Sequence, residues 1–446
     1  MRFAVVGGGI SGLVAAYKLR QSLGPDAEIV IAEASDRVGG KLRTVSLAGD
    51  DIDIGAEAFV GRRPEVPALL RELGLADQLV HPSGLRPVIW ADGDARPLPP
   101  GTLMGIPAGP EYLDRLVDGE TLAKIEAEPT TQFAWDRTSD CTVEELVAAR
   151  FGEQVVQRSV DPLLGGVYSG SSRTIGVRGA LPTLATALDD GAPSLTEAVR
   201  RALPPPSTAP VFGGIRDGYG VLLDALVRES AADVRVGTRV QTITRVPGGQ
   251  WAIGGIGPVD GVVLALPARW AAELLSGLNH AAAQALREVP LASSALVALA
   301  FPAGVELPQR SGILVATGEP LRAKAFTLSS RKWPHLAERE VKLVRASFGR
   351  FGDPVSAWSD AELIGAARED FAVVSGVLAE PVDALVQHWP DGLPQYGPGH
   401  LDRVAAVEAG IAELDGIEIA GAFLHGVGVP ACVASGAAAA TRLVAR

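Results

Sequence analysis

The 446-residue sequence predicts an α/β fold in which a discontinuous Rossmann-like domain carries two inserted domains. Three observations predict it. The chain opens with an apolar strand and a glycine-rich turn, a continuous apolar run of strand length occurs near its middle, and a strand, a turn and a helix close it. We assign the nucleotide-binding domain to residues 1–80, 204–268 and 384–446, an α+β domain to 81–102 and 269–383, and a mainly helical domain to 103–203.

The first element is an apolar strand, residues 3–6, followed by a glycine-rich turn and by a helix that begins near Ser11. Gly7, Gly9 and Gly12 fit Gly-x-Gly-x-x-Gly, whose glycines permit a tight turn, close approach of a pyrophosphate and close packing of helix on strand. The N-terminus of the helix favours the anion through its free N–H groups and its dipole. Because the chain contains 52 glycines, the pattern is weak alone, and the flanking strand and helix make it specific.

The second strand, residues 29–32, leads to Glu33, whose carboxylate can bind ribose hydroxyls. A carboxylate there would repel a 2′-phosphate, which argues against NADP. A second glycine turn lies within residues 37–44. The opening segment therefore predicts dinucleotide binding by Gly7, Gly8, Gly9, Ile10, Ser11, Gly12 and Glu33.

The middle of the chain predicts a hairpin, then helices, then mixed elements. Residues 86–98 have the pattern of a β-hairpin, helical periodicity dominates 103–203, and the prolines at 204–206 break the chain. Beyond the break we expect helices at 219–230 and 361–374, and strands at 234–236, 240–246, 251–253, 259–266, 295–301, 313–316, 323–328 and 341–348. The run 259–266 is apolar apart from Asp260, as in a strand that is buried on both faces.

The end of the chain repeats the strand–turn–helix pattern of its beginning. A short strand at 416–421 leads to Gly426 and Gly428, and a helix of small residues follows over 431–444. Pro430 suits the first position of that helix. We expect the N-terminus of this helix to face the same cofactor as the opening turn.

Composition excludes several classes of protein. A hydrophobic content of 47% with 21% charged residues is typical of a folded domain, and no apolar run reaches the roughly 18 residues of a membrane-spanning helix. The chain begins directly with a strand, so we expect no secretion and a cytoplasmic location. The net charge of −12 argues against nucleic acid. Cys141 and Cys432 are too few for a disulfide framework, and no ligand spacing indicates a metal.

Several motifs resemble known enzymes. Residues 37–44 and 53–58 are similar to the FAD-binding motifs of the amine oxidase-like superfamily, whose fold is related to that of p-hydroxybenzoate hydroxylase. Three stretches resemble the porphyrinogen oxidases of haem biosynthesis (the protoporphyrinogen oxidase family): DPLLGGVYSG at 161–170, PQYGPGH at 394–400 and GVGVPAC at 426–432. Residues 98–107 and 331–335 are similar to the Gram-positive and actinobacterial branch, and the resemblance extends over essentially the whole chain.

The resemblance implies an FAD-dependent oxidase that uses O₂ and removes six electrons from coproporphyrinogen III, giving coproporphyrin III and H₂O₂. Protoporphyrinogen IX is the alternative substrate. In such enzymes flavin N5 accepts the hydride, so no catalytic side chain is predicted, and the FAD is expected to be held non-covalently. His400 and His425 are interpreted as turn or packing residues.

Carried over by motif, further cofactor-binding residues are Arg37, Gly40, Lys41, Arg43, Gly55, Ala56, Glu57, Ala58, Val240, Ala422, Val427, Gly428 and Val429. Coproporphyrinogen carries four propionates, which local cations must bind. Arg62 and Arg63 are the first candidates, and Arg96, Arg331 and Lys332 are weaker ones. Gly166, Val167 and Tyr168 are expected to form a wall beside the macrocycle.

Two other functions remain open at this stage. One is a flavin amine or carotenoid oxidoreductase, although residues 422–436 offer only Phe423 for the aromatic pair of amine oxidases. The other is a non-catalytic FAD-binding protein, for which a full set of substrate-side motifs would be unnecessary. The sequence also leaves open the oligomeric state, association with a membrane surface, contact with other haem-pathway enzymes, and which arginines bind propionates.

Overall fold

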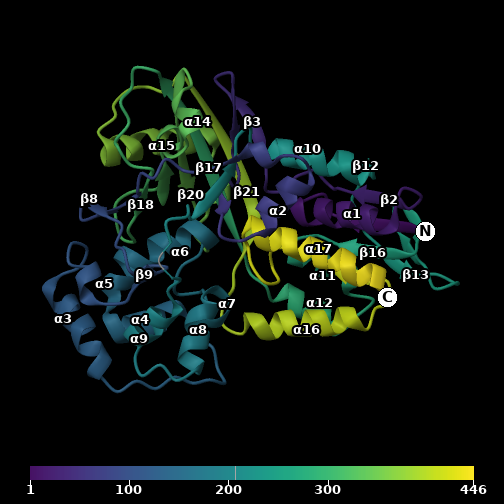
Figure 1. Cartoon of the computed structure of the whole chain (residues 1–446), viewed down its shortest axis with the longest axis horizontal. Coiled ribbons are helices and arrows are strands. Elements are labelled where there is room, and N and C mark those ends of the chain that lie inside the picture. Colours follow the sequence, from purple (N-terminus) through teal and green to yellow (C-terminus); the bar gives the residue numbers. More distant parts are fainter. Residues whose placement is uncertain (206, 446) are drawn as a thin grey trace.

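The computed structural model describes residues 1–205 and 207–445, so Pro206 of the predicted break and Arg446 lie outside the described residues. The molecule is elongated (Figure 1). A parallel sheet with its helices occupies the end that carries both chain termini, and a second sheet and a group of helices occupy the other end.

The parallel sheet contains five strands in the order β12-β2-β1-β16-β22. They come from the beginning, the middle and the end of the chain, as the discontinuous Rossmann-like fold requires. Their bounds are β1 Arg2–Val6, β2 Glu28–Ala32, β12 Asp233–Arg235, β16 Gly261–Leu264 and β22 Ile417–Ile419. The predicted α/β class is therefore confirmed.

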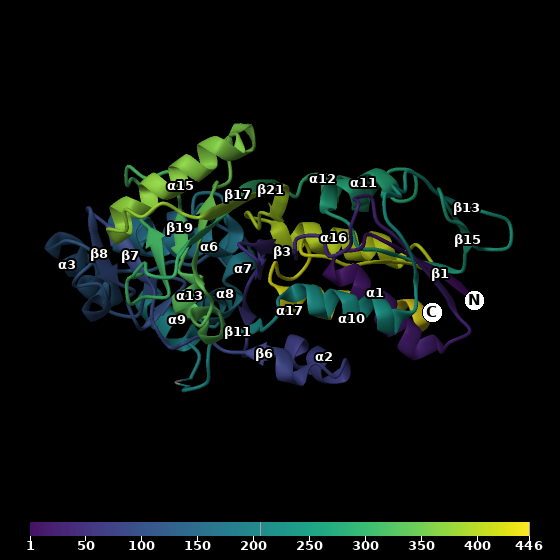
Figure 2. The same cartoon turned by 90° about the horizontal axis from the view of Figure 1, so that it is seen from above.

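Both faces of this sheet are covered, because alternate residues of each strand belong to different cores. Val5 and Ile31 face α1 (Ile10–Leu23), α10 (Tyr219–Ser230) and α17 (Val429–Ala445). Val6 and Val30 face the side of α11 (Ala268–Leu275), α12 (His280–Arg287) and α16 (His400–Ala412). Figure 2 shows these two groups of helices on opposite sides of the sheet.

The second sheet has seven strands in the order β21-β17-β20-β19-β18-β7-β8. Only the pair formed by β18 and β7 is parallel. Helix α15 (Asp360–Ser375) shares a hydrophobic core with this sheet. The strand bounds are β7 Val88–Ala91, β8 Asp94–Pro97, β17 Leu291–Pro302, β18 Gly312–Val315, β19 Ala325–Thr327, β20 Val341–Phe348 and β21 Asp383–Pro394.

The helical part has its own apolar core and also touches the second sheet through Ile89 and Ala91 of β7. A π-helical turn, Val156–Val160, precedes α6. The helices are α3 Gly119–Ala127, α4 Val143–Phe151, α5 Glu153–Val155, α6 Asp161–Tyr168, α7 Val177–Ala180, α8 Pro182–Asp189 and α9 Leu195–Ala202.

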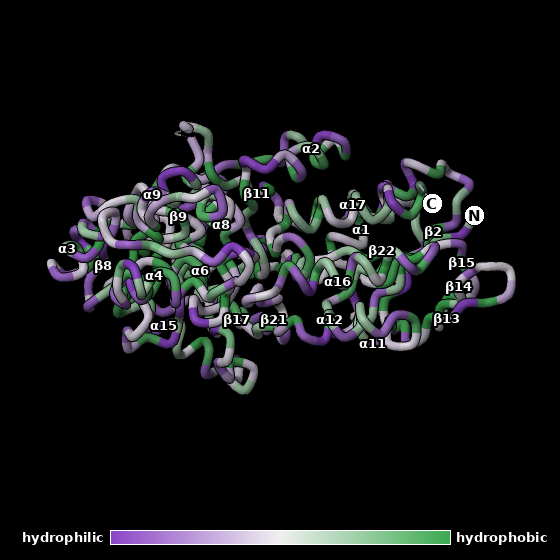
Figure 3. Tube along the Cα trace, turned by 90° about the horizontal axis from the view of Figure 1, so that it is seen from below, coloured by the Kyte–Doolittle hydropathy of each residue, from purple (hydrophilic) through white to green (hydrophobic). Residues whose placement is uncertain are grey.

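The remaining elements are short. They are β3 Thr44–Leu47, β4 Asp50–Asp53, β5 Phe59–Val60, β6 Leu79–Val80, β9 Thr102–Leu103, β10 Ile106–Pro107, β11 Phe212–Ile215, β13 Ile243–Arg245, β14 Trp251–Ile253, β15 Gly257–Val259, α2 Glu65–Glu72, α13 Ser329–Lys332 and α14 Pro334–Ala337. Hydrophilic and hydrophobic residues alternate along many helices (Figure 3). Within the described residues, no helix is long and apolar enough to cross a membrane.

Most predicted elements are confirmed, and four details are corrected. The single strand expected at 259–266 is divided, because Val259 ends β15 in the small antiparallel sheet and β16 begins at Gly261 in the parallel sheet. The strand expected at 240–246 shortens to β13, because the backbone at 237–238 turns back to pair with Glu33 and Ser35. Pro430 is the second rather than the first residue of α17. Strand β21 was not predicted, and it pairs with β17 in the second sheet. We therefore propose that the α+β domain extends to Pro394.

Candidate active site

The opening turn has the steric properties that its glycines predict. Gly7 has φ +107°, and a Cβ there would lie 2.3 Å from the oxygen of Ala265. A Cβ on Gly12 would lie 1.9 Å from the oxygen of Gly7. By contrast, a Cβ on Gly9 would meet nothing nearer than the Cα of Gly40 at 4.0 Å. The open side of the turn is thus the one that a pyrophosphate would approach, and the residues fit that group.

Glu33 lies at the end of β2 with its carboxylate oriented by backbone groups. Oε2 accepts a hydrogen bond from Gly8 N at 2.8 Å, and Oε1 accepts one from Ser35 N at 2.8 Å. Oε1 also accepts from Ser35 Oγ at 2.8 Å, so Oε2 is the oxygen that keeps a further acceptor position for a ribose hydroxyl. The N–H of Thr238 donates to the Glu33 carbonyl at 2.8 Å, which brings the segment before Val240 to the same place. Val240 itself is 9% exposed and packs in the adjoining core.

The second glycine turn rests directly on the first, since Gly39 N donates to Gly8 O at 2.8 Å. The Arg37 guanidinium donates to the carbonyls of Val38, Gly40 and Leu42 at 3.1, 2.7 and 3.2 Å. Its role in the structure is to hold this turn closed. Lys41 is exposed beside the turn, and Arg43 donates to the side chain of Gln387 on β21.

The N-terminal ends of α1 and α17 meet. Ser11 Oγ donates to the Cys432 carbonyl at 2.9 Å, and a Cβ on Gly436 would lie 2.2 Å from the Ser11 carbonyl oxygen. The two helices lie side by side in Figure 1. Both helix N-termini, with their unpaired N–H groups, therefore face one region. Ile10 is buried, whereas Gly428 is exposed just before α17 and Val427 is half-buried.

Residues 53–58 contact both the second glycine turn and the seven-stranded sheet. Asp53 Oδ1 accepts hydrogen bonds from Thr44 Oγ1 at 2.7 Å and from Tyr219 N at 3.0 Å, so it caps α10 from a distance. Burial raises the pKa of Asp53 to about 6, although these two hydrogen bonds act to lower it. A Cβ on Gly55 would lie 2.1 Å from the Lys41 carbonyl oxygen, so the segment passes close under the second turn. Ala56 and Ala58 are half-buried on either side of Glu57.

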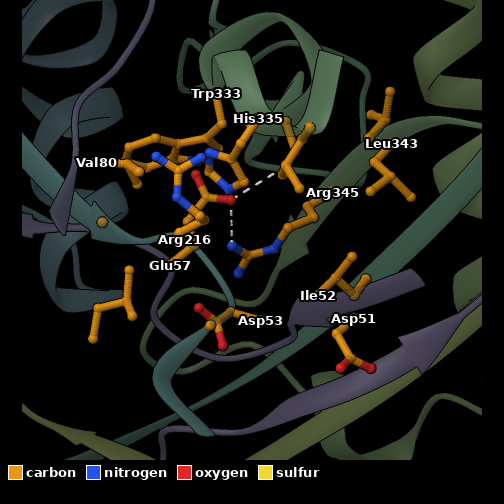
Figure 4. A pocket seen from close by; sticks show the side chains of 16 residues that line it. Asp51, Ile52, Asp53, Glu57, Val80, Arg216, Trp333, His335, Leu343 and Arg345 are labelled. Carbon is orange, nitrogen blue, oxygen red and sulfur yellow. Dashed lines mark hydrogen bonds and ion pairs between the residues drawn. The ribbon is translucent and has the colours of Figure 1, made fainter. Parts of the chain in front are cut away.

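Glu57 lies in an ion cluster, where its carboxylate faces the guanidinium of Arg345 on β20 (Figure 4). Its carboxylate pairs with Arg345 and with Lys332, each at 2.6 Å, and accepts a hydrogen bond from Ser329 Oγ at 3.2 Å. Burial alone would raise the pKa of Glu57, but the two cations hold it well below its usual range. Arg345 also donates to the Gly55 carbonyl at 2.5 Å.

A small polar cavity of about 30 Å³ adjoins this cluster (Figure 4). That volume holds about two water molecules. Burial, assisted by Arg339 and Arg216, lowers the pKa of His335 on the cavity wall to about 4, so this imidazole is neutral at pH 7.

Helix α6 presents the predicted wall residues. Gly166 and Val167 are exposed, and a Cβ on Gly166 would have open space around it. Tyr168 is buried, with its ring 5.6 Å from that of Tyr396. Tyr396 in turn donates from its hydroxyl to the Ala422 carbonyl at 2.5 Å. The three sequence motifs at 161–170, 394–400 and 426–432 thus meet around the loop before α17.

The predicted substrate-binding cations differ in their surroundings. Four of the five already have partners: Arg63 pairs with Glu65, Arg96 with Asp94, Arg331 donates to the Leu307 carbonyl, and Lys332 pairs with Glu57. Arg62 is exposed in the turn between β5 and α2, and within the described residues its guanidinium has no bonding partner. Arg62 is therefore the cation that is free to bind an anion.

The two histidines have ordinary packing roles. His400 is buried, its ring stacks on Tyr396 at 3.8 Å, and burial lowers its pKa to about 4. His425 is exposed beside Glu408. Both cysteines are free thiols, and no group of three potential metal ligands occurs among the described residues.

Sequence reasoning missed several residues of this region. Trp389 on β21 donates to the Ile54 carbonyl at 3.3 Å, and Gln395 donates to the Tyr168 carbonyl at 2.7 Å. Arg345 is also absent from the predicted set. Trp389 and Gln387 belong to a strand whose Pro390, Asp391 and Gly392 have the pattern of a turn, so only the strand pairing reveals them.

Comparison with known proteins agrees with this geometry. The family model of flavin-containing amine oxidoreductases matches residues 10–444. The coproporphyrinogen III oxidase of Mycobacterium tuberculosis (strain ATCC 25618 / H37Rv) is 50% identical over 449 residues, covering 99% of this chain and 97% of that protein. The coproporphyrinogen III oxidase of Bacillus subtilis (strain 168) is 28% identical and covers 98% and 96%.

Solved structures support the fold assignment. A crystal structure from Exiguobacterium sp. 255-15, provisionally named protoporphyrinogen oxidase, has a TM-score of 0.88 at 29% identity and covers 100% of this chain and 99% of that one. Cyclohexylamine oxidase from Brevibacterium oxydans IH-35A has a TM-score of 0.72 at 16% identity, with coverage of 100% and 98%, and so shares the fold alone.

Proposed function

The chain belongs to the flavin-containing amine oxidoreductase family, and we propose that it is an FAD-dependent oxidase that converts coproporphyrinogen III to coproporphyrin III in haem biosynthesis. The observation that carries the proposal is the full-length 50% identity to coproporphyrinogen III oxidases of mycobacteria. O₂ is the proposed electron acceptor and H₂O₂ the second product. The cytoplasmic location stays a prediction.

The FAD would be held by residues that the structure brings together at the carboxyl ends of β1 and β2. The N-terminus of α1 would bind the pyrophosphate, and Glu33 the adenosine ribose. The loop before α17 and residues 55–58 would hold the flavin ring. A helix N-terminus near reduced flavin would favour its negative charge by about 1 kcal/mol.

We propose that the flavin is bound without a covalent link. Cys432 is the one cysteine near this loop, and it is 8% exposed on α17. Burial raises the pKa of its thiol, which keeps it protonated and poorly nucleophilic at pH 7. Its Sγ contacts the Val427 carbonyl at 3.9 Å rather than an open site.

The substrate would lie between the flavin and α6. Gly166 and Val167 offer a flat surface without large side chains, which suits a macrocycle. Arg62 would bind a propionate, with Arg63 beside it. Tyr168 would support the wall from behind through its contact with Tyr396.

When bound, FAD accepts a hydride from the porphyrinogen and is reoxidised by O₂, three times for each macrocycle. The residues of this chain orient the two molecules and exclude water. No side chain is proposed as an acid or base, since His400 is packed against Tyr396 and His335 faces the small cavity. Burial lowers the pKa of both imidazoles to about 4, which makes them weak bases at pH 7.

Anaerobic mixing with coproporphyrinogen III tests the proposal. We expect the flavin absorbance to bleach and to return on admission of O₂, with formation of coproporphyrin and H₂O₂. Steady-state kinetics should give a higher kcat/KM for coproporphyrinogen III than for protoporphyrinogen IX. A flavin that is not bleached would indicate a binding protein, and equal kcat/KM values would contradict the proposed substrate.

A further inference from the structure

Lys324 is a buried lysine that forms no ion pair with a carboxylate of the described residues. It lies just before β19 and is 4% exposed. Nζ donates to Ser169 Oγ and to the Gly349 carbonyl, each at 2.5 Å. Burial, with a smaller contribution from Arg350, lowers its pKa to about 7. An ammonium in such a place costs stability, so its retention calls for a role that an apolar side chain would not fulfil.

Both partners of Lys324 belong to segments that hold the C-terminal end of α6. Ser169 ends this helix in the left-handed conformation, with φ +47°. Gly349 begins the loop after β20, and Phe351 N in the same loop donates to the Ser169 carbonyl at 2.7 Å. Lys324 thus joins α6, the end of β20 and the start of β19 at one point.

The other end of α6 is attached to the second sheet separately. Asp161 accepts hydrogen bonds from Ser172 N at 2.9 Å and from Thr317 Oγ1 at 3.0 Å. The exposed residues Gly166 and Val167 lie between the two attachments. Gly166 has no side chain and Val167 is exposed, so neither residue anchors this part of the helix. Its position therefore depends on the attachments at the two ends of α6.

We propose that Lys324 is a positioning residue for porphyrinogen binding, because its two hydrogen bonds place the face of α6 formed by Gly166 and Val167. The proposal rests on the proposed function, in which this face is a wall of the macrocycle site. Lys324 itself does not reach that face, so its effect is transmitted through Ser169.

The charged groups around Lys324 do not mask its titration. Arg350 and Asp353 lie in the loop after β20, and Asp353 accepts from Arg350 N at 2.7 Å. On α15, Asp370 is paired with Arg322. Tyr168 of α6 has a pKa raised to about 12 by burial and stays neutral. Charge-assisted hydrogen bonds are stronger than neutral ones. The hydrogen bonds from Lys324 to Ser169 and Gly349 therefore weaken as pH rises through about 7.

Replacement of Lys324 by methionine tests the proposal, because methionine fills a similar volume without hydrogen bonds. For K324M holoenzyme we expect KM for coproporphyrinogen III to rise about tenfold, a change of about 1.4 kcal/mol, with kcat altered less than twofold. The wild-type KM should increase between pH 6 and 8, whereas that of K324M should not. FAD affinity should be unchanged in both.

Two further variants are compared with K324M. Ser169→Ala removes one of the two hydrogen bonds without changing a charge, and should give a smaller rise in KM. Lys124→Met is the matched control, because Lys124 is an exposed lysine of α3 that donates only to the Ala148 carbonyl. Its KM and pH profile should equal those of the wild type.

An unchanged KM and pH profile in folded K324M would overturn the inference, as would a loss of kcat alone. If K324M does not fold, an unchanged KM in Ser169→Ala overturns it instead. A wild-type protein that oxidises no porphyrinogen contradicts the proposed function and this inference with it. An active wild type with unaltered variants contradicts this inference alone.

Discussion

At the residue scale, Glu33 and Glu57 are two carboxylates of the N-terminal segment whose different surroundings give them different roles. Glu33 is held by the backbone N–H groups of Gly8 and Ser35 and by the Ser35 hydroxyl, and its Oε2 keeps an acceptor position for a ligand. Glu57 is surrounded by Arg345 of β20 and by Lys332 and Ser329 of α13. Both are predicted cofactor-binding residues, but only Glu33 has an oxygen free to contact the cofactor, while Glu57 would act by fixing residues 55–58.

The free guanidinium of Arg62 leads to a mutational prediction. Arg62→Ala should raise KM for coproporphyrinogen III about tenfold, because a hydrogen bond to a charged group contributes about 1.5–3 kcal/mol when both partners are otherwise unpaired. Arg63→Ala should raise KM less, since Arg63 is paired with Glu65. Initial-rate kinetics over a range of substrate concentrations check both values.

Arg228→Ala serves as the control, because Arg228 is an exposed arginine of α10 paired with Glu229. Its KM should equal that of the wild type. If Arg62→Ala behaved like this control, propionate binding at the turn after β5 would be contradicted.

At the element scale, the contact between α1 and α17 decides the geometry of the cofactor site. The crossing is close because Gly436 has no side chain and faces the Ser11 carbonyl. Each helix was predictable from its own pattern. Their contact was not, because residues 11 and 432 are 421 positions apart in the chain.

Gly436→Ala should therefore disturb both stability and cofactor binding. A Cβ 2.2 Å from the Ser11 oxygen forces the helices apart, and overpacking of this kind costs about 1–3 kcal/mol of unfolding free energy. We expect a lower Tm and weaker FAD binding, measured by thermal unfolding and by fluorescence titration of the apoprotein.

The matched control is Gly365→Ala on α15, where a new Cβ would meet nothing within 4 Å. The same substitution there should stabilise the protein by about 0.5–1 kcal/mol, because alanine favours helices more than glycine does. Equal effects of the two substitutions would show that the helix contact is unimportant.

At the scale of the whole molecule, several buried groups make stability depend on pH, and Asp53 and Lys324 do so in opposite directions. His335 and His400, whose pKa values are lowered to about 4, oppose Asp53 over the same acidic range. Asp53 has a pKa raised from 3.8 to about 6, so the folded state binds more protons between these values and stability falls as pH rises from 3.8 to 6. Lys324 has a pKa lowered from 10.5 to about 7, so the unfolded state binds more protons and stability rises from pH 7 towards 10.5.

Urea unfolding across pH 4–10 measures this dependence. Asp53→Asn should remove the fall that Asp53 contributes between pH 3.8 and 6, so the stability of this variant should rise more with pH in that range than that of the wild type. K324M should flatten the rise above pH 7, and each variant should leave the other pH range unchanged. Asparagine keeps an oxygen that can accept from Tyr219 N, which preserves the cap of α10. A variant whose pH profile matches the wild type would contradict the assignment of that pH dependence to that residue.

The sequence by itself determined the α/β class, the strand–turn–helix at both ends and the dinucleotide chemistry of Glu33, because these depend on residues that are close in the chain. The family motifs indicated the substrate class in the same local way. Only the tertiary structure decided that Lys332 is neutralised by Glu57, 275 positions away, that Lys324 reaches Ser169, 155 positions away, and that β21 joins the second sheet. Ion pairs and strand pairing join distant segments, so no local pattern records them, and they decide which cations stay free to bind a ligand.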